Sequence, residues 1–103
     1  MQLRQIAHSR TGDKGNTANI SVIAYRTEDY AFLEKHVTVE RVRDHFRGIV
    51  TGAVVRYTLP RIGALNFVLE GALGGGVTRS LALDAHGKSL SSAILSLELP
   101  DEG

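Results

Sequence analysis

Cysteine is absent from this 103-residue chain. The chain can therefore form neither a disulfide nor a thiolate metal site, and it has no cysteine nucleophile. Long hydrophobic runs are also missing, since no apolar stretch approaches the roughly 20 residues that a membrane-spanning helix needs. The first residues, Met1 to Gln5, lack the apolar core of a signal peptide. We therefore expect a cytoplasmic protein with no membrane association.

A large excess of charge of either sign is missing as well. Twelve Lys and Arg residues face eleven Asp and Glu residues, which gives a formal net charge of +1. Proteins that bind nucleic acid by neutralising its phosphates usually have a strongly basic composition, so this balance of charge argues against such binding.

The length of the chain is typical of a protein with one hydrophobic core. We expect a single domain over residues 1–99 and a disordered tail over residues 100–103.

The hydrophobic pattern predicts a mixture of short strands and helices. Strands are expected over residues 3–8, 18–25, 53–59 and 78–83 because these stretches are rich in alternating or β-branched residues. Thr27 and Thr38 are expected to cap two helices. A strongly apolar helix is expected from Gly63 to Leu73, ended by three glycines. Residues 89–99 suit either a helix or a strand, and we favour a helix that runs into an extended tail.

The order of these elements predicts the fold class. It reads strand, strand, helix, helix, strand, helix, strand, followed by the mixed last segment. Such an order favours an α+β sandwich, with an antiparallel or mixed sheet covered by helices on one face.

Residues 9–16 hold the densest cluster of chemically capable side chains. Glycine lets backbone amides converge, and Arg10 and Lys14 supply positive charge, which is the chemistry of an anion-binding loop. The alternative is an ordinary long turn in which Asp13 and Lys14 pair in solvent. The length of the segment favours a functional loop.

Other candidate site residues are isolated. His8 adjoins this loop and is a candidate acid or base, as is Asp13, whereas His36 and His45 are expected on helix surfaces. No histidine or carboxylate stands at metal-ligand spacing, so no metal site is expected. Asn66 is expected in the first turn of the apolar helix, where it would cap the helix or face a ligand.

The common nucleotide-binding motifs are absent from the sequence. The stretch Gly87-Lys88-Ser89 ends like a P-loop but lacks the required earlier glycine, and no dinucleotide-binding glycine pattern occurs. Residues 12–15 match the G-x-x-G of a KH-type RNA clamp, yet a strand is expected after them. RNA binding through Gly12 to Gly15 is therefore the least favoured function.

Several motifs together resemble a known family. They are residues 8–16, 19–24, 57–60, 64–67, 73–76, and Asp84 with Gly87 and Lys88. In this order, over nearly the whole chain, they look like the C-terminal domain of the acyclic terpene utilisation (AtuA) family. The resemblance implies a ferredoxin-like sandwich with a four- or five-stranded, largely antiparallel sheet and helices on one face. In AtuA-like proteins this module follows a large domain associated with acyl-CoA breakdown of branched acids.

The resemblance also implies a set of site residues. Thr11 stands where serine is expected, and both residues keep a hydroxyl. The residues implied for a ligand or interface surface are Arg10, Thr11, Gly12, Asp13, Lys14, Gly15, Asn16, Asn19, Asn66, Gly74, Gly75 and Gly76.

Two functions follow as expectations. The first is a non-catalytic accessory subunit, linked to acyl-CoA or branched-acid catabolism, that completes a site on a separately encoded AtuA-type large subunit. The second is a stand-alone enzyme or binding protein for a CoA thioester or another anionic metabolite, held by the loop of Arg10 to Asn16. No cofactor is expected, and self-association is expected under both because a one-sided sheet leaves a face and edges for a second copy.

Overall fold

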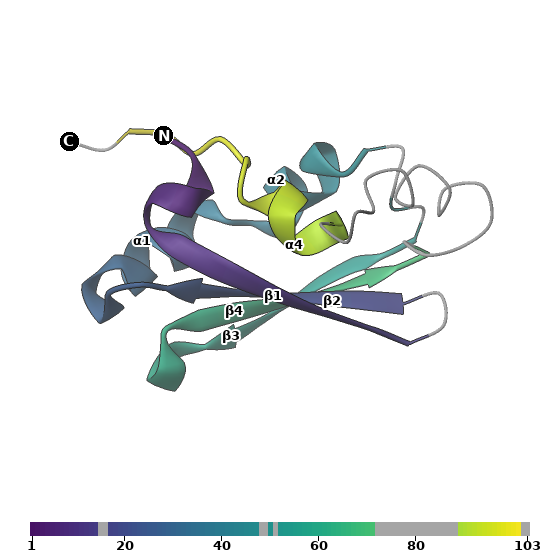
Figure 1. The fold of residues 1–103 in the computed structure, drawn as a ribbon, viewed down its shortest axis with the longest axis horizontal. Helices are drawn as coiled ribbons and strands as arrows, with labels where there is room; N and C mark the ends of the chain where they lie inside the picture. Colours follow the sequence, from purple (N-terminus) through teal and green to yellow (C-terminus); the bar gives the residue numbers. More distant parts are fainter. Residues whose placement is uncertain (15–16, 48–49, 51, 72–88, 102–103) are drawn as a thin grey trace.

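A computed structural model describes residues 1–14, 17–47, 50, 52–71 and 89–101 (Figure 1). Its centre is a four-stranded sheet in the order β1-β2-β4-β3, and every neighbouring pair is antiparallel. The strands are β1 (Ala7–Lys14), β2 (Thr17–Ala24), β3 (Val54–Leu59) and β4 (Ala64–Glu70). Antiparallel pairing throughout agrees with the expected α+β sandwich.

The helices of the described residues lie on one face of this sheet (Figure 1). They are α1 (Tyr30–His36), α2 (Val39–His45) and α4 (Ser89–Ile94). Short 3₁₀ turns precede β1, α1 and β4, at Leu3–Gln5, Thr27–Asp29 and Pro60–Ile62. The Thr38 side chain accepts a hydrogen bond from the Arg41 amide at 3.1 Å, which confirms the predicted cap of the second helix.

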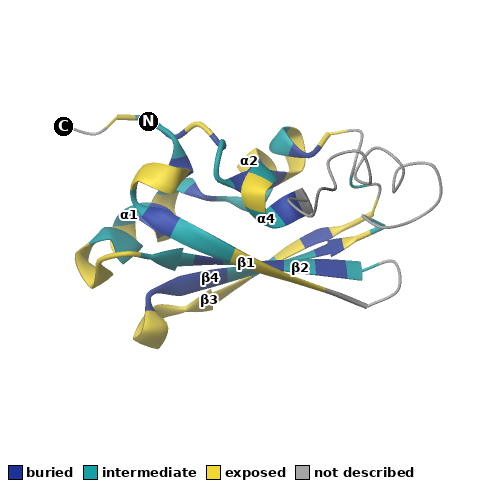
Figure 2. Cartoon of the chain, in the orientation of Figure 1, coloured by how far each residue is buried: buried dark blue, intermediate teal, exposed yellow. Residues whose placement is uncertain are grey.

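Alternation along the central strands places the core between the sheet and the helices. Every second residue of β2 and of β4 is buried on the helix side, and Figure 2 shows this banding. The largest fully buried side chains are Phe46, Phe67, Leu3, Ile20, Leu33, Leu65, Leu69 and Ile94. The two faces of the sheet therefore differ, since one packs on helices and the described helices leave the other uncovered.

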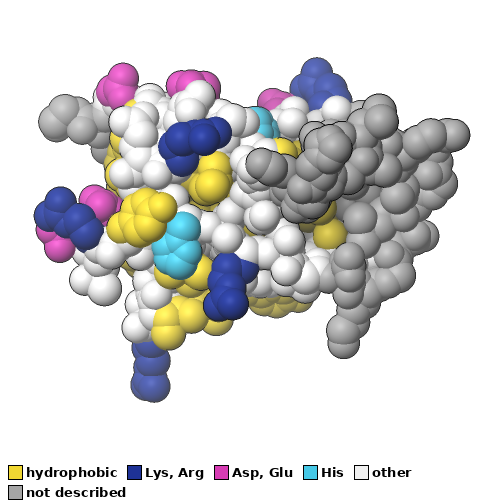
Figure 3. Space-filling view, in the orientation of Figure 1, with side chains coloured by type: hydrophobic (Ala, Val, Ile, Leu, Met, Phe, Trp, Pro, Cys, Tyr) yellow, Lys and Arg dark blue, Asp and Glu magenta, His cyan; other side chains and the backbone are white. Residues whose placement is uncertain are grey.

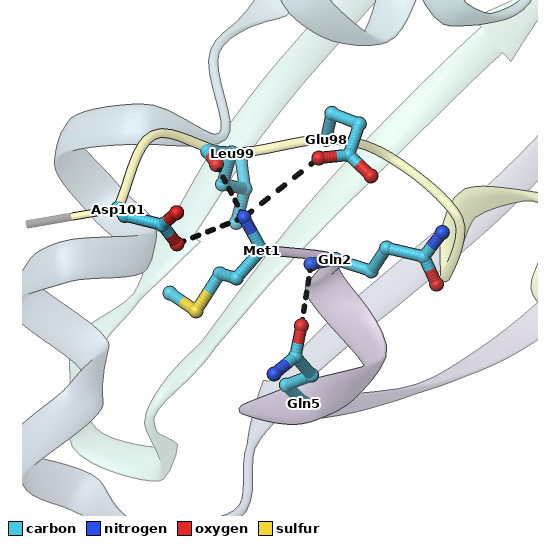
Figure 4. A network of polar contacts seen from close by, with 6 residues as sticks. All are labelled: Met1, Gln2, Gln5, Glu98, Leu99 and Asp101. Carbon is cyan, nitrogen blue, oxygen red and sulfur yellow. Dashed lines mark hydrogen bonds and ion pairs between the residues drawn. The ribbon is translucent and has the colours of Figure 1, made fainter.

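The two ends of the chain meet above the helix layer (Figure 4). The Met1 ammonium donates to the Leu99 carbonyl at 2.9 Å and to the Asp101 carboxylate at 3.0 Å. Backbone bonds from Leu3 to Leu97 and from Leu99 to Met1 continue this contact. The hydrogen bond from Asp101 is the main cause that raises the pKa of the terminal amine. The last residues thus anchor the start of β1.

Most predicted elements are present with shifted ends. The strand predicted over residues 3–8 is a 3₁₀ turn followed by β1, and the strand predicted over residues 18–25 is β2. The helix expected after Thr27 begins as a 3₁₀ turn and continues as α1, but the predicted cap was wrong, because Arg26 and Asp29 hold the two N-cap positions and Thr27 lies inside the turn. The last segment is a helix that runs into an extended tail, as favoured.

Two predicted elements were wrong. Residues 9–14 are not a loop but the body of β1, paired with β2 up to Lys14 opposite Thr17. The apolar stretch after Gly63 is not a helix but β4, which lies between β2 and β3. Gly63 itself has a left-handed backbone with φ of 66°, which closes the turn before β4. Of the four residues compared with a KH-type clamp, Gly12 to Lys14 belong to β1 and Gly15 lies outside the described residues.

The predicted strand over residues 78–83, the turn after it and the glycine run of Gly74 to Gly76 lie outside the described residues. Within the described part, no helix is long and apolar enough to cross a membrane.

Candidate functional site

The face of the sheet that the helices leave uncovered holds the candidate site. Because neighbouring residues of a strand point to opposite faces, the residues between the core positions share this surface. We call it the open face. Its described members are His8, Arg10, Gly12, Asn19, Ser21, Ile23, Val55, Tyr57, Leu59, Ala64, Asn66, Val68 and Glu70.

The strand register aligns four polar side chains in one row across the open face. Arg10 pairs with Ser21, Ser21 pairs with Asn66, and Asn66 pairs with Tyr57. The row therefore crosses all four strands in the order β1, β2, β4 and β3. Neighbouring strands lie about 4.8 Å apart. We call this row the polar row.

Hydrogen bonding within the polar row is incomplete. The Asn66 Nδ2 group donates to the Ser21 hydroxyl at 2.9 Å. The Asn66 carbonyl oxygen and the exposed Arg10 guanidinium have no hydrogen-bond partner among the described residues. A guanidinium offers five donors in a fixed plane, which suits carboxylates and carbonyl groups. The row thus presents unused donors and an unused acceptor to whatever lies above it.

Gly12 and Asn19 form the adjacent row. The two residues pair across β1 and β2, and a Cβ at residue 12 would stand 3.4 Å from Asn19 Nδ2, which is an ordinary van der Waals contact. The Asn19 carboxamide therefore lies above the Gly12 backbone. It has no hydrogen-bond partner among the described residues.

Aromatic and aliphatic side chains flank this polar centre. His8 stacks on Tyr25, with ring centroids 5.2 Å apart. At the other side, Val55, Tyr57 and Leu59 of β3 are exposed. Figure 3 shows hydrophobic, histidine and basic side chains next to one another on the surface. Such a mixture of aromatic residues and arginine is typical of protein interfaces.

The structure brings some of the expected site residues together. Arg10, Gly12, Asn19 and Asn66 lie on the open face, within the two neighbouring rows. Thr11 lies on β1 with the opposite alternation, away from them. Asp13 and Lys14 continue β1 by their backbone, but their side chains, like Gly15, Asn16 and Gly74 to Gly76, lie outside the described residues.

Two residues of the polar row, Ser21 and Tyr57, were missing from the expected site. Their signal was present in the alternation of β2 and β3, where each stands between two residues of the opposite face. The row could have been found only with Asn66 placed on a strand, because Asn66 is the member that joins Ser21 to Tyr57.

Candidate acid and base groups find no catalytic setting in the described residues. The His8 ring is held by its stacking on Tyr25, and no group of three histidine or acidic residues could hold a metal ion there. The Ser9 hydroxyl donates to the Ser91 carbonyl at 2.5 Å, which joins β1 to α4. Ser9 thus serves a packing contact between the sheet and a helix.

His45 differs from its expected place on a helix surface. It is half-buried, and its Nε2 atom lies 2.7 Å from the Ala93 carbonyl, so it joins α2 to α4. The Ser96 hydroxyl donates to the same carbonyl at 2.9 Å and lies 3.3 Å from His45 Nε2. Because His45 and Ser96 both bond the Ala93 carbonyl, these two side chains hold α2 against α4, and His45 is not placed to activate the Ser96 hydroxyl as a nucleophile.

Comparison with known proteins gives one match. A family model described as the AtuA ferredoxin-like domain matches residues 1–100. Compared with curated proteins and with solved structures, the chain gives no match. The matched span includes every strand and helix described above.

Proposed function

The chain belongs to the AtuA ferredoxin-like domain family, and we propose that it is a non-catalytic accessory subunit whose open face docks on a separately encoded AtuA-type large subunit. The proposed role is cytoplasmic and lies in the breakdown of acyl-CoA or branched acids, as the resemblance implies. In this role the polar row completes a site that the partner chain carries.

One observation carries the proposal: the open face holds polar groups that no described residue uses. Arg10, Asn19 and Asn66 hold donors and an acceptor that no described residue uses. The short side chains of Asn19 and Asn66 on their strands lose little conformational freedom when a partner binds them, whereas Arg10 contributes a charged donor at a larger cost in side-chain entropy. A partner surface with carboxylate or carbonyl acceptors opposite Arg10 fits this arrangement.

The position of the helices supports the same role. Helices cover the other face of the sheet, so the open face is the broad face left for a partner. The described residues show no nucleophile, base and orienting group in contact, which an enzyme of this size would need. The accessory role requires no such group in this chain.

A pull-down tests the proposal. The tagged chain is used as bait in its native lysate, beside the double variant Arg10→Ala with Asn66→Ala, and the bound proteins are identified by mass spectrometry. The matched control is Arg43→Ala, which removes an exposed arginine from α2 on the helix side. We expect a near-stoichiometric AtuA-type large chain with wild type and control, and its loss with the double variant. Recovery of that chain with all three, or with none, would contradict the proposal.

Binding of a small anion is the second candidate, and two hydrogen-bond donors in neighbouring rows favour it. The Arg10 guanidinium and the Asn19 carboxamide lie on the open face without a hydrogen-bond partner among the described residues. The ligand class is a CoA thioester or another anionic metabolite. Thermal-shift titration with CoA esters should raise the melting temperature of wild type and not of Arg10→Ala. A flat response in both proteins would reject this candidate.

A further inference from the structure

β3 is an edge strand of the described sheet. It pairs with β4 on one side, and no described strand pairs with its other side. The Glu70 amide donates to the Ala53 carbonyl at 2.9 Å, which shows which residues of β3 direct their backbone N–H and C=O groups toward β4. The backbone groups of Val55, Tyr57 and Leu59 therefore face β4, whereas those of Arg56 and Thr58 face outward. These outward groups form a template for another strand.

The side chains of β3 do not protect this edge. On the open face, Val55, Tyr57 and Leu59 are 36%, 55% and 40% exposed, and Ile62 after the strand is 64% exposed. A hollow of about 350 Å³ formed by residues 58–62 continues this apolar surface. Exposed edges of soluble proteins are usually guarded by charged residues or by distortion. Here the uncharged surface follows the whole length of the strand.

The one charged residue of β3 is directed elsewhere. Arg56 lies on the helix face, and its guanidinium donates to the carbonyls of Glu34 and Val37 at 2.7 and 3.0 Å. The opposite edge of the sheet differs, because β1 carries His8 and the exposed Arg10. The two edges of the sheet thus have different chemistry, and β3 is the edge suited to pairing.

We infer that two copies of this chain associate through β3, which pairs antiparallel with β3 of the second copy about Tyr57, so that one eight-stranded sheet forms. A second copy fits because the strand is complementary to itself. With the two Tyr57 residues opposite each other, Val55 faces Leu59 of the second copy, and Arg56 faces Thr58. The apolar positions are then matched, and no two charges of like sign are opposed.

A neighbouring register is less suitable. A shift that places Arg56 opposite itself also pairs outward-facing groups, but it sets two guanidinium groups directly across from each other on the helix face. Like charges at opposed positions destabilise a sheet. Pro60, which has no amide hydrogen, limits the ladder at the end of β3. Pairing about Tyr57 is therefore the register that the residues favour.

The pairing would have a consequence for the open face. A two-fold axis perpendicular to the sheet keeps both open faces on one side, and it joins the two polar rows into one row across eight strands. Seven strand spacings separate the two Arg10 residues, which amounts to about 34 Å. Both copies of Arg10, Asn19 and Asn66 remain uncovered. The inference therefore stands whether or not the proposed large subunit exists.

A cysteine cross-link tests the pairing directly, because the natural chain has no cysteine. Opposed residues at a position without mutual hydrogen bonds have Cα atoms about 4.5 Å apart, which is within the range of a disulfide. Tyr57→Cys should therefore form a covalent dimer under mild oxidation. Val55→Cys is the matched control, since residue 55 of one copy lies roughly 13 Å along the strand from residue 55 of the other.

Light scattering on the purified protein provides the second measurement. We expect a mass twice the 11.1 kDa of one chain, and the mass of one chain for Tyr57→Lys, which sets two ammonium groups opposite each other at an exposed site. A wild-type monomer at about 100 µM would overturn the inference. So would a dimer in which Tyr57→Cys cross-links no better than Val55→Cys, because such a dimer uses another surface or register. Neither result bears on capture of the large subunit.

Discussion

Replacement of Arg56 by methionine should destabilise the fold by about 2 kcal/mol. The Arg56 guanidinium bonds the carbonyls of Glu34 and Val37, which lie at the end of α1. The last carbonyls of a helix lack partners within the helix, and the negative end of the helix dipole favours a cation. Arg56 therefore fastens the end of α1 to β3.

The magnitude follows from the two hydrogen bonds and their exposure. A hydrogen bond to a charged group contributes roughly 1.5–3 kcal/mol when buried. Arg56 is half-buried, so each bond is assigned about 1 kcal/mol after allowance for solvent. Methionine keeps most of the apolar stem, which separates loss of the guanidinium from loss of packing.

Thermal unfolding followed by circular dichroism measures the effect. For a domain of this size, 2 kcal/mol corresponds to a fall in melting temperature of roughly 8–16 °C. Arg61→Met is the control, because Arg61 is exposed in the turn before β4. Equal melting temperatures for Arg56→Met and Arg61→Met would refute the assignment of these bonds to stability.

Three further predictions concern single side chains. Burial raises the pKa of Tyr30 and outweighs the lowering by the neighbouring Thr58 hydroxyl, and the Tyr30 hydroxyl makes no hydrogen bond of good geometry among the described residues. Tyr30→Phe should therefore leave the free energy of unfolding unchanged or raise it by up to about 1 kcal/mol in urea unfolding; a fall of more than about 1 kcal/mol would show that the contact with Thr58 stabilises the fold. Gly12→Ala should raise the free energy of unfolding by about 0.5–1 kcal/mol in urea unfolding, because the new Cβ makes an ordinary contact with Asn19 and alanine loses less conformational freedom on folding than glycine; a loss of stability would contradict this. The hydrogen bond to the Asp101 carboxylate raises the pKa of the Met1 amine above its ordinary value of 8.0. The stabilisation that the charged amine provides is therefore complete below pH 8.0 and is lost as pH rises through the raised pKa. Asp101→Asn should lower the melting temperature by more at pH 7 than at pH 10, and an equal decrease at both pH values would contradict this.

The error at β4 shows where periodicity fails. Leu65, Phe67 and Leu69 alternate as a strand requires, but Val68 and Ala72 also fit a helical stripe. β4 lies between two strands, so its open-face positions are partly covered as well, and its sequence reads as almost continuously apolar. Asn66 and Glu70 on the alternate positions were the signal for a strand.

The error at β1 has a different cause. Gly12 and Asp13 are residues that usually break strands, so the segment reads as a loop. In the structure β1 is an edge strand with one face open, and its partner β2 supplies the strong strand pattern. Pairing with β2 overrides the local preference, and just two residues separate the two strands. The α+β class survived both errors, because a strand in place of one predicted helix still leaves α1, α2 and α4 packed on an antiparallel sheet.

The candidate site was accessible from sequence in part. Resemblance selected Arg10, Gly12, Asn19 and Asn66, whose rows now adjoin on one surface. Their common face could not be deduced, because Asn66 was assigned to a helix and Arg10 to a loop. Which face of a strand a residue occupies depends on register, and register depends on pairs of strands far apart in the chain.

The affinity between this chain and its captured partner tests the central claim most directly. Isothermal titration would compare wild type, the double variant Arg10→Ala with Asn66→Ala, and Arg43→Ala against the purified large chain. The account predicts a dissociation constant at least about 100-fold larger for the double variant, which is a loss of about 2.7 kcal/mol in binding free energy, and wild-type affinity for Arg43→Ala. Equal affinities of all three proteins would contradict the assignment of the open face as the docking surface.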